Sequence, residues 1–489
     1  MNKKKLTGWL AAFAGIAAAI VATTGGLNKP APRPSDGPPP VSAPMGYLAV
    51  WVSDGARPIE GAAVLAEGLP ALPAGANADG WTGVAAPFGG YIVRVSAPNF
   101  HPAERAVNVA GHTDLRIALE REAAPALPVR IDGRFWITDA GAFRPLFQSG
   151  LTLLVRGPPE RAAFLDATRA LGFNGIRVFA GALRWAGQSA EHARATLPTL
   201  LDEAAARGLY VYVSAITDSR DGGYDVEAHL RQVAAIVAQH PNGLLEVANE
   251  IGHPTQSDRV NDQPWLLAVA RRVIPAGVSW ALGAPIGTDE PDELGRYRGD
   301  GGLFNTAHLD RGRDKWNQVR RLREIEAISA ATRRPAMSGE PIGADEWMGG
   351  ATGTRQRRND PEFFFTLGAL SRGFELGTVF HSQAGLDGQL LGPVQRECAE
   401  AFLAGWRALN TTDRLTFVNA GWPGSPVASA NFNHNGIVRA YSYVSGHRGW
   451  TVLLGINGDP GVRWGGGWSP VGVVAERPGV QIISITKGQ

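Results

Sequence analysis

The hydrophobic positions of this chain follow two different patterns. Residues 46–121 and 411–489 contain short apolar or alternating runs, and turn dipeptides such as Asp79-Gly80 separate the runs of the first region, which is typical of antiparallel strands. We therefore predict a small β-sandwich at each end of the folded part. The strands are expected at 47–52, 62–65, 91–95 and 115–119 in the first sandwich, and at 438–444, 450–456 and 480–486 in the second.

Between them, residues 122–410 alternate β-type runs with longer amphipathic stretches, as expected of βα units around a parallel sheet. Eight such units within about 290 residues favour an α/β fold of the (β/α)8 TIM barrel type. A doubly wound sheet is the alternative, but no glycine-rich phosphate turn follows the first strand. The expected strands are 150–155, 175–179, 210–215, 244–248, 280–283, 303–307, 335–338 and 378–381, with helices at 160–171 and 197–207.

The N-terminal region has the composition of an export segment. Three lysines at residues 3–5 precede an apolar run at 6–22, which falls just short of the roughly 20 residues needed to span a membrane. A cleaved signal peptide and a retained anchor both remain open for residues 1–26. Seven prolines in residues 27–45 predict an extended linker. We expect a secreted or periplasmic protein, or one tethered to a membrane through residues 6–22 with its folded part outside the cytoplasm.

Composition narrows the class of protein further. With 44% hydrophobic and 19% charged residues, the chain is too apolar to be disordered. A formal net charge of +2 excludes strong electrostatic steering to nucleic acid, so no nucleic-acid partner is expected. Cys398 is the only cysteine, which excludes an intrachain disulfide and a cysteine-based zinc site. No His-Glu-x-x-His run is present, and we expect neither a metal nor a cofactor.

Two glutamates stand at the ends of predicted barrel strands. Glu250 follows the strand at 244–248, and Glu340 follows the strand at 335–338. The C-terminal strand ends of a (β/α)8 barrel meet at one face, where catalytic groups gather. Two converging carboxyl groups roughly 5–5.5 Å apart are what retaining glycoside hydrolysis requires, one to protonate the leaving oxygen and one to attack the anomeric carbon. Glu246 lies inside its strand, where a structural ion pair is expected.

The residues around these glutamates resemble a known family. Asn249-Glu250, Gly339-Glu340 and the run Gly172-Phe173-Asn174-Gly175-Ile176-Arg177-Val178 are similar to clan A glycoside hydrolases of the cellulase and mannanase type. The resemblance covers about residues 131–409. It implies that Glu250 is the acid/base and Glu340 the nucleophile, that Asn249 holds the sugar 2-hydroxyl, and that Arg177 supports the Glu340 carboxylate. His308 lies where the clan often places a His or Tyr near the nucleophile.

Electrostatics agrees with these roles. A neighbouring arginine favours an ionised Glu340, whereas a drier site beside another negative charge favours a protonated Glu250. The first predicted sandwich also resembles carboxypeptidase regulatory-like modules, on the strength of the series 58–62, 79–80, 89–91 and 97–100. That resemblance implies no chemistry of its own.

The chain departs from the clan pattern at two places. The proline that usually follows Asn-Glu is replaced by Ile251-Gly252-His253-Pro254, and the eighth strand ends in Phe380-His381-Ser382-Gln383, where the clan commonly presents a sugar-stacking Trp. His381 is a candidate to replace that contact through hydrogen bonds, although a core role is equally open. The aromatic residues that could form the sugar-binding floor instead, or serve only in packing, are Trp185, Tyr212, Tyr224, Trp316 and Trp347.

The sequence therefore predicts an exported three-part protein whose barrel hydrolyses β-glycosidic bonds of a polysaccharide or oligosaccharide with retention. A second hypothesis is a carbohydrate-binding or adhesion protein that keeps the barrel without turnover. Residues 355–358 form a basic stretch, for which a solvated loop face is the first interpretation and contact with an acidic glycan the second.

Overall fold

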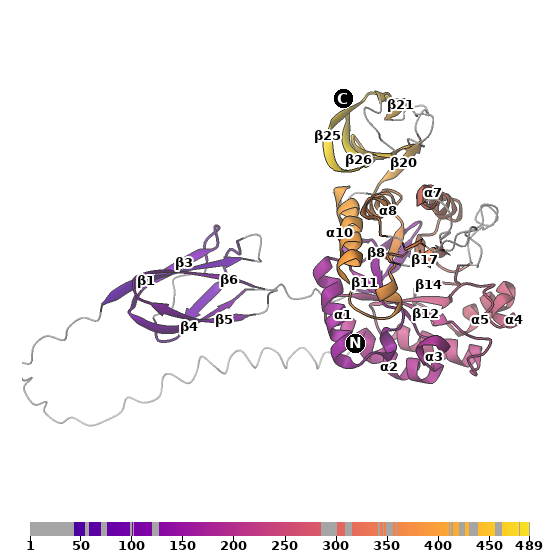
Figure 1. The fold of residues 1–489 in the computed structure, drawn as a ribbon, viewed down its shortest axis with the longest axis horizontal. Helices are drawn as coiled ribbons and strands as arrows, with labels where there is room; N and C mark the ends of the chain where they lie inside the picture. The colour runs from indigo at the N-terminus through magenta and orange to yellow at the C-terminus, as the bar shows by residue number, and fades with distance from the viewer. Residues whose placement is uncertain are drawn as a thin grey trace, which may run out of the picture. The chain divides into compact units, whose positions relative to one another are not determined.

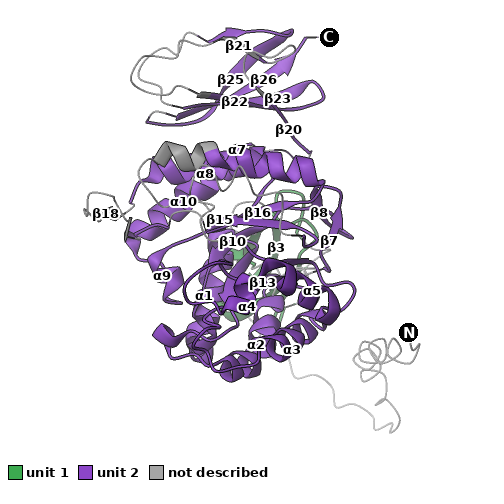
Figure 2. Cartoon of the chain, turned by 90° about the vertical axis from the view of Figure 1, so that its right-hand side faces the viewer, with its two compact units in different colours: residues 1–120 green, residues 121–489 purple. Residues whose placement is uncertain are grey.

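A computed structural model gives the arrangement of the chain. It divides into two compact units, residues 1–120 and 121–489 (Figure 2). Within the described residues, no helix is both long and apolar enough to cross a membrane. The predicted export segment at 6–22 lies outside those residues. The structure describes residues 44–53, 58–69, 76–97, 100, 102–119, 127–284, 301–308, 315–340, 343–345, 347–348, 356–357, 359–409, 411, 414–419, 426–429, 439–454, 462–478 and 480–488.

The N-terminal unit consists of two three-stranded sheets, β3-β1-β6 and β2-β4-β5. Apolar side chains from both sheets, including Leu48, Val50, Val93 and Val95, form one buried cluster. The four predicted strands are present. β3 and β5 were not predicted, because the side chains of β5 are mostly exposed and those of β3 are small or half-exposed. The strands are β1 (Met45–Ser53), β2 (Ala63–Ala66), β3 (Trp81–Pro87), β4 (Gly89–Ser96), β5 (Ala103–Val109) and β6 (His112–Ala118).

The second unit is built on an eight-stranded parallel sheet in the order β14-β13-β12-β11-β10-β19-β16-β15 (Figure 1). Backbone N–H groups of Leu303 and Phe304 donate to the carbonyl oxygen of Trp280 at 2.7 and 3.3 Å, which links the two ends of the sheet. The predicted (β/α)8 barrel is therefore confirmed as a nearly closed barrel. Its strands are β10 (Leu146–Ser149), β11 (Gly175–Phe179), β12 (Tyr210–Ile216), β13 (Gly243–Ala248), β14 (Trp280–Ala281), β15 (Asn305–His308), β16 (Ala336–Glu340) and β19 (Gly377–Phe380).

The first predicted barrel strand was wrong. The strand is β10, and most of the predicted segment 150–155 forms a turn and the 3-10 helix η1 (Leu153–Val155). Leu151, Leu153 and Leu154 are buried there through packing rather than strand pairing. A short apolar run does not by its periodicity distinguish these two environments.

Helices cover the outside of the barrel (Figure 1). Gly157 caps α1, where the Glu160 carboxylate accepts the Gly157 N–H at 2.9 Å, and Gly172 ends that helix with φ 101°. The predicted helix at 197–207 is the second half of α2, which begins earlier because Ser189 caps it through the His192 N–H. The helices are α1 (Pro158–Leu171), α2 (Ala190–Ala205), α3 (Val226–Ala238), α4 (Asp258–Asn261), α5 (Gln263–Val273), α7 (Lys315–Thr332), α8 (Pro361–Gly373), α9 (Gln383–Leu386) and α10 (Pro393–Ala408), with the 3-10 helix η2 (Arg184–Ala186).

Two further sets of strands complete this unit. A small sheet of β7 (Arg130–Asp132), β8 (Phe135–Thr138) and β9 (Gly141–Phe143) packs Trp136 against Phe304 inside the barrel, with ring centroids 6.0 Å apart. A C-terminal sheet in the order β20-β22-β23-β26-β25 shares a hydrophobic core with α8 and α10, where Phe374 packs on Tyr443. The remaining strands are β17 (Trp347–Met348), β18 (Gln356–Arg357), β20 (Thr416–Asn419), β21 (Val427–Ser429), β22 (Arg439–Ser445), β23 (Arg448–Leu454), β24 (Arg463–Trp464), β25 (Trp468–Arg477) and β26 (Val480–Lys487).

Candidate active site

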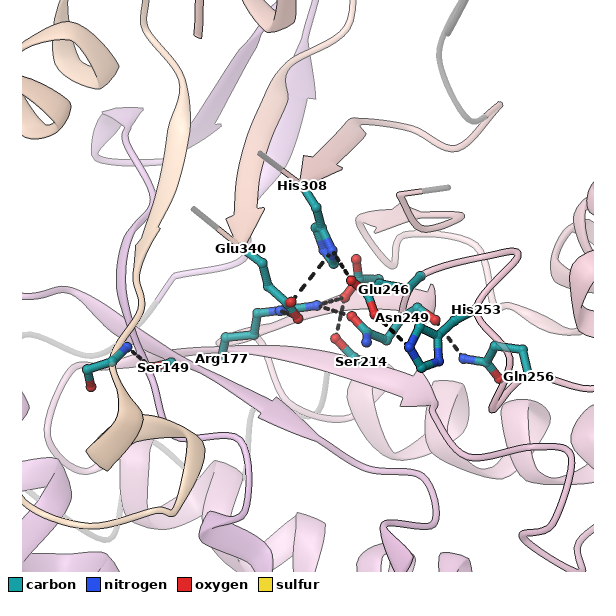
Figure 3. Close-up of polar contacts among 11 residues, drawn as sticks. Ser149, Arg177, Ser214, Glu246, Asn249, His253, Gln256, His308 and Glu340 are labelled. Atoms are coloured by element: carbon teal, nitrogen blue, oxygen red, sulfur yellow. Dashed lines mark hydrogen bonds and ion pairs between the residues drawn. The ribbon is translucent and has the colours of Figure 1, made fainter. Parts of the chain in front are cut away.

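Arg177 forms the floor of the candidate site. It lies in β11, is fully buried, and donates from Nη1 to Glu340 Oε1 at 2.6 Å (Figure 3). Its Nη2 donates to Glu246 Oε2 at 2.6 Å and to Asn249 Oδ1 at 2.9 Å. The Ser214 hydroxyl also donates to the Glu246 carboxylate. One guanidinium therefore links side chains from β11, β13 and β16, as its planar fork of donors allows.

Arg177 stays protonated despite its burial. Burial disfavours the cation, but Glu246 and Glu340 outweigh that penalty and raise the pKa of Arg177 above its ordinary value. The expected structural ion pair of Glu246 and the expected contact of Arg177 with Glu340 are both present. The permanent positive charge of Arg177, 2.6 Å from Glu340, favours the ionised form of that carboxyl group.

Glu340 reaches the site because strand β16 is irregular at its end. The register between β15 and β16 shifts so that His308 lies opposite Glu340, which leaves Gly339 as the extra residue. Such a bulge re-aims the side chains beside it. A Cβ at Gly339 would lie 3.3 Å from His308 Nε2 and 3.1 Å from Thr306 Oγ1, so a glycine there lets the imidazole approach Glu340.

Glu250 lies beyond the end of β13 in a left-handed backbone conformation, with φ 46°. Its neighbours hold it there, since Asn249 N–H donates to Ile216 O and Ile251 N–H to Ala284 O, each at 2.9 Å. For a residue with a Cβ this conformation carries strain of about 1–3 kcal/mol, which is found most often at functional sites. The side chain is 26% exposed and faces the cleft.

His308 lies between the two carboxylates. Its Nδ1 is 3.4 Å from Glu250 Oε1 and 3.7 Å from Glu340 Oε2 (Figure 3). Burial disfavours the imidazolium, but Glu340 and then Glu250 outweigh it and raise the pKa of His308. On the solvent side, His253 Nε2 lies 3.9 Å from Glu250 Oε2. Glu250 is thus flanked by two imidazoles and Glu340 by a guanidinium and an imidazole.

Glu250, His308 and Glu340 also have the spacing of a possible metal site, since one donor atom from each lies within 4.8 Å of the others. Arg177 already occupies Glu340 with a fixed positive charge, which weakens that carboxylate as a ligand for a second cation. His308 Nδ1 and Glu250 Oε1, 3.4 Å apart, are close enough to share a proton.

Glu250 and Glu340 line a cleft of about 290 Å³. Its polar lining residues include Asn249 and Gln256 beside the two glutamates. Its apolar lining consists of the buried residues Leu151, Phe179 and Leu183 together with Trp185 and Leu386. The cleft therefore offers hydrogen-bonding groups and apolar surface to the same ligand.

The predicted aromatic and histidine contacts have different outcomes. Trp185 lines the cleft. Tyr212 corrects the prediction, because it is fully buried in the barrel interior with its ring 5.5 Å from the Arg177 guanidinium. Its place beneath the floor follows from its position inside β12, all of whose side chains are buried. Tyr224 packs on His229, with ring centroids 4.8 Å apart.

For His381, the structure agrees with the core role rather than with the sugar contact, the two alternatives that the sequence left open. His381 is fully buried behind the end of β19, where its carbonyl accepts the Ala344 N–H at 2.9 Å, and it is absent from the described lining of the cleft. Trp316 and Trp347 belong to α7 and β17, but their side chains lie outside the described part of the structure.

Two polar residues of the loop after β13 were not predicted at the site. Gln256 donates from Nε2 to the Asn249 carbonyl at 2.6 Å, and His253 approaches Glu250. The only sequence signal was the replacement of the usual proline by a longer histidine-containing segment. Spacing along a loop does not show which way it folds back.

Comparisons with known proteins define the class of fold. No family model matches the chain, and no curated protein matches it. Among solved structures, a glycoside hydrolase family 5 protein from Bacteroides vulgatus has a TM-score of 0.53 at 13% identity, over 74% of this chain and 93% of that one. A second glycoside hydrolase has a TM-score of 0.53 at 12% identity, over 74% of this chain and 97% of that one.

At this identity the likeness establishes the fold. The chain has the barrel fold seen in glycoside hydrolases of family 5, in agreement with the clan A resemblance of its strand-end motifs. The relation of the N-terminal sheets to carboxypeptidase regulatory-like modules stays a prediction.

Proposed function

We propose that this chain is a retaining β-glycoside hydrolase of polysaccharides or oligosaccharides, with Glu340 as nucleophile and Glu250 as acid/base. The observation that carries the proposal is the close approach of the Glu250 and Glu340 carboxyl groups, together with the contact of Arg177 with Glu340. A carboxylate oxygen of each lies within 4.8 Å of the other's, and of the two only Glu340 accepts a hydrogen bond from Arg177. This close approach suits direct attack on the anomeric carbon better than the wider gap that an inverting enzyme needs for water.

In the first step, Glu340 attacks the anomeric carbon while the bond from that carbon to the glycosidic oxygen breaks. Arg177 keeps the nucleophile ionised until then, at 2.6 Å. Glu250 donates its proton to the leaving oxygen and becomes a carboxylate. His308, 3.4 Å away, then stabilises that negative charge.

In the second step, Glu250 accepts a proton from water, the water oxygen attacks the anomeric carbon, and Glu340 departs as a carboxylate. Asn249 has its Oδ1 fixed by Arg177 and its carbonyl fixed by Gln256. Its side-chain NH₂ group is thereby aimed away from the guanidinium, as a donor to the sugar 2-hydroxyl.

A trapping experiment tests the assignment. A 2-deoxy-2-fluoro glycoside with an activated leaving group should label the protein once. The fluorine slows both steps, and the activated leaving group keeps formation of the glycosyl-enzyme faster than its breakdown. Peptide mass mapping should place the sugar on Glu340. A label on any other residue would refute the assignment of the nucleophile.

The second candidate is a carbohydrate-binding protein without turnover. It is favoured by the end of β19, where His381 is buried and Ser382 caps α9 through the Gly385 N–H, so that neither supplies a stacking ring. Saccharide binding without hydrolysis of any aryl β-glycoside or polysaccharide in a broad panel would support this candidate.

We also propose that the protein is exported. The lysines at residues 3–5, the apolar run at 6–22 and the proline-rich segment at 27–45 support this. Fractionation of cells that produce the full chain, with immunodetection of its C-terminus, tests the proposal, and protein confined to the cytoplasm would contradict it.

A further inference from the structure

Trp185 is an exposed aromatic residue of the candidate active site. Its side chain is 54% exposed, and it lines the cleft that holds Glu250 and Glu340. Tryptophan is highly buried on average, so a large exposed indole in a cleft indicates a surface that a ligand covers.

The turn that carries Trp185 is rigid. Leu183 and Gln188 exchange two backbone hydrogen bonds of 2.9 and 3.0 Å across it, and Gly187 adopts the left-handed conformation that closes it, with φ 69°. The Gln188 side chain donates from Nε2 to the carbonyls of Phe179 and Gly181, at 2.8 and 2.7 Å. The indole is therefore presented by a preorganised hairpin rather than by a loose loop.

The same turn is fastened to the loop after β12. The backbone N–H of Arg184 donates to Asp218 Oδ2 at 3.1 Å, and the Thr217 hydroxyl donates to the Ala182 carbonyl. A Cβ at Gly181 would lie 2.5 Å from Thr217 Oγ1, so the two loops are in direct contact. Because the platform is fixed beforehand, a ligand that covers it loses little entropy in ordering the protein.

The described apolar residues that line the cleft include no second exposed ring. Phe179 lines it but is only 6% exposed, and the other apolar lining residues are the aliphatic Leu151, Leu183 and Leu386. Trp185 is thus the described lining residue able to present a broad flat face to a pyranose ring, whose C–H groups form an apolar face of matching shape.

The charge of the cleft indicates which saccharide fits. Its described lining includes the carboxylates of Asp218, Glu250 and Glu340 and no lysine or arginine. Arg177, which forms the floor, is fully buried, and its charge is matched by Glu246 and Glu340. A uronic acid or sulfated sugar would meet the carboxylates of Asp218 and Glu340 here, whereas a neutral sugar would find acceptors for its hydroxyl groups.

We propose that Trp185 is the sugar-stacking platform of this cleft and that the cleft takes a neutral β-linked oligosaccharide. The stacking surface comes from the loop after β11, in place of the end of β19. This inference rests on the proposed function, since it specifies the substrate class of the same site.

Binding to a turnover-deficient full chain provides the test. In a Glu340→Gln background, we would titrate cellotetraose, mannotetraose, xylotetraose and laminaritetraose by calorimetry, with trigalacturonate as the anionic probe. At least one neutral tetrasaccharide should bind. Adding Trp185→Ala should weaken its Kd about tenfold, equivalent to about 1.4 kcal/mol. Trp185→Phe should keep most of the affinity, because it retains a stacking ring.

The matched control is Trp265→Ala. Trp265 is another partly exposed tryptophan of the barrel, but it lies in α5 and packs on the core with Arg259 over its ring, 5.5 Å from the centroid, and does not line this cleft. Its replacement should change the Kd by less than twofold. A general loss of stability would instead weaken binding in both variants, which their melting temperatures would reveal.

Three results would overturn the inference: an unchanged Kd in Trp185→Ala, tighter binding of trigalacturonate than of every neutral probe, or no binding of any neutral tetrasaccharide. The proposed function is judged separately, by fluoro-sugar labelling of the unmodified chain. Labelling of Glu340 without an effect of Trp185→Ala would leave the hydrolase assignment intact and remove the platform. Saccharide binding that depends on Trp185 without any labelling would keep the platform and remove the hydrolase assignment.

Discussion

The two carboxylates of the cleft differ sharply in their surroundings. Glu340 is the last residue of β16, its side chain is 5% exposed, and it is held by the buried Arg177. Glu250 lies outside its strand with φ 46°, is 26% exposed, and has His308 and His253 within 4 Å. One side of the site fixes a charge, whereas the other places a carboxyl group among groups able to exchange a proton.

Chemically identical side chains can be suited to opposite roles by their surroundings. A nucleophile works when its negative charge is permanent, which a buried cation ensures. An acid/base must gain and lose a proton in each cycle, and contact with water and with imidazoles suits that need.

The largest effect is expected from removing either ionisable group. Glu340→Gln and Glu250→Gln preserve size, so both should fold normally. Each should lose turnover by a factor on the order of 10³ or more on a substrate with a poor leaving group, because one loses the nucleophile and the other loses acid/base assistance worth about 10²–10⁴. Steady-state kinetics with circular dichroism as the folding control measures this.

Azide separates the two roles. With an activated aryl leaving group, the first step needs little acid, so Glu250→Ala should still form the glycosyl-enzyme and yield the β-glycosyl azide. Glu340→Ala should instead yield the α-azide, through direct attack from the open side. NMR of the isolated azides identifies the anomers, and the reverse pattern would exchange the two assignments.

Arg177→Met should have the next largest effect. It leaves Glu246 and Glu340 buried without their shared cation, and breaking a buried pair costs about 3–5 kcal/mol of unfolding free energy. The acidic limb of kcat/KM should move to higher pH by about 1–3 units, because the charge that favours ionised Glu340 is gone. Urea denaturation and a pH profile measure the two effects.

Arg177→Lys is the conservative comparison. Its charge should keep part of the effect of Arg177, so the acidic limb should move less than in Arg177→Met. It should position the carboxylates less well, since an ammonium cannot bridge Glu340, Glu246 and Asn249 as the planar fork does. An acidic limb that stays in place in Arg177→Met while activity is merely scaled down would make Arg177 a structural residue only.

His308→Asn should act on the basic limb. Although burial opposes its charge, Glu340 and Glu250 raise the pKa of His308 above 6.5, against a smaller opposing effect of Arg177. The imidazole and the Glu250 carboxyl group therefore titrate as a pair. The second of the two protons leaves this pair at a higher pH than the single proton would leave Glu250 without the imidazole. The basic limb of kcat/KM should move to lower pH in His308→Asn. A shift to higher pH would show that His308 acts only as a positive charge on Glu250.

The sequence was enough to predict the barrel and the floor of the site. The repeat of βα units predicted the fold class, and Glu250 and Glu340 were singled out because the chemistry of a (β/α)8 barrel lies at strand ends. Arg177 and Asn249 were named through the resemblance to clan A glycoside hydrolases. Residues 175–179 form β11 as predicted. The first strand was misplaced because β10 carries the polar Gln148, while the more apolar run that follows it packs without pairing.

The sequence was not enough to assign the walls of the cleft. Trp185 and Tyr212 are both aromatic residues near strand ends, yet one lines the cleft and the other is in the core. Every side chain of β12 is buried, so no alternation marks the face that Tyr212 occupies. The approach of His253 to Glu250 depends on how a loop folds back, and the exposure of Trp185 depends on a hairpin closed by Gln188 and Gly187.

The smallest effect is expected from removing the N-terminal unit, because every described residue of the cleft belongs to the second unit. A chain that begins at Pro125 retains Leu127, whose backbone exchanges two hydrogen bonds with the Tyr210 hydroxyl, at 3.0 and 3.1 Å. It also retains Val129, whose carbonyl accepts the Ser279 hydroxyl. These contacts tie the start of the barrel unit to β12 and to the residue before β14, so the shortened chain should fold on its own.

Its kcat/KM on a soluble aryl glycoside should stay within twofold of the full chain, measured alongside its melting temperature. If the shortened chain melted normally but had lost catalysis, the N-terminal unit would have to complete the site, and the contrast between Glu340 and Glu250 alone would not explain the chemistry.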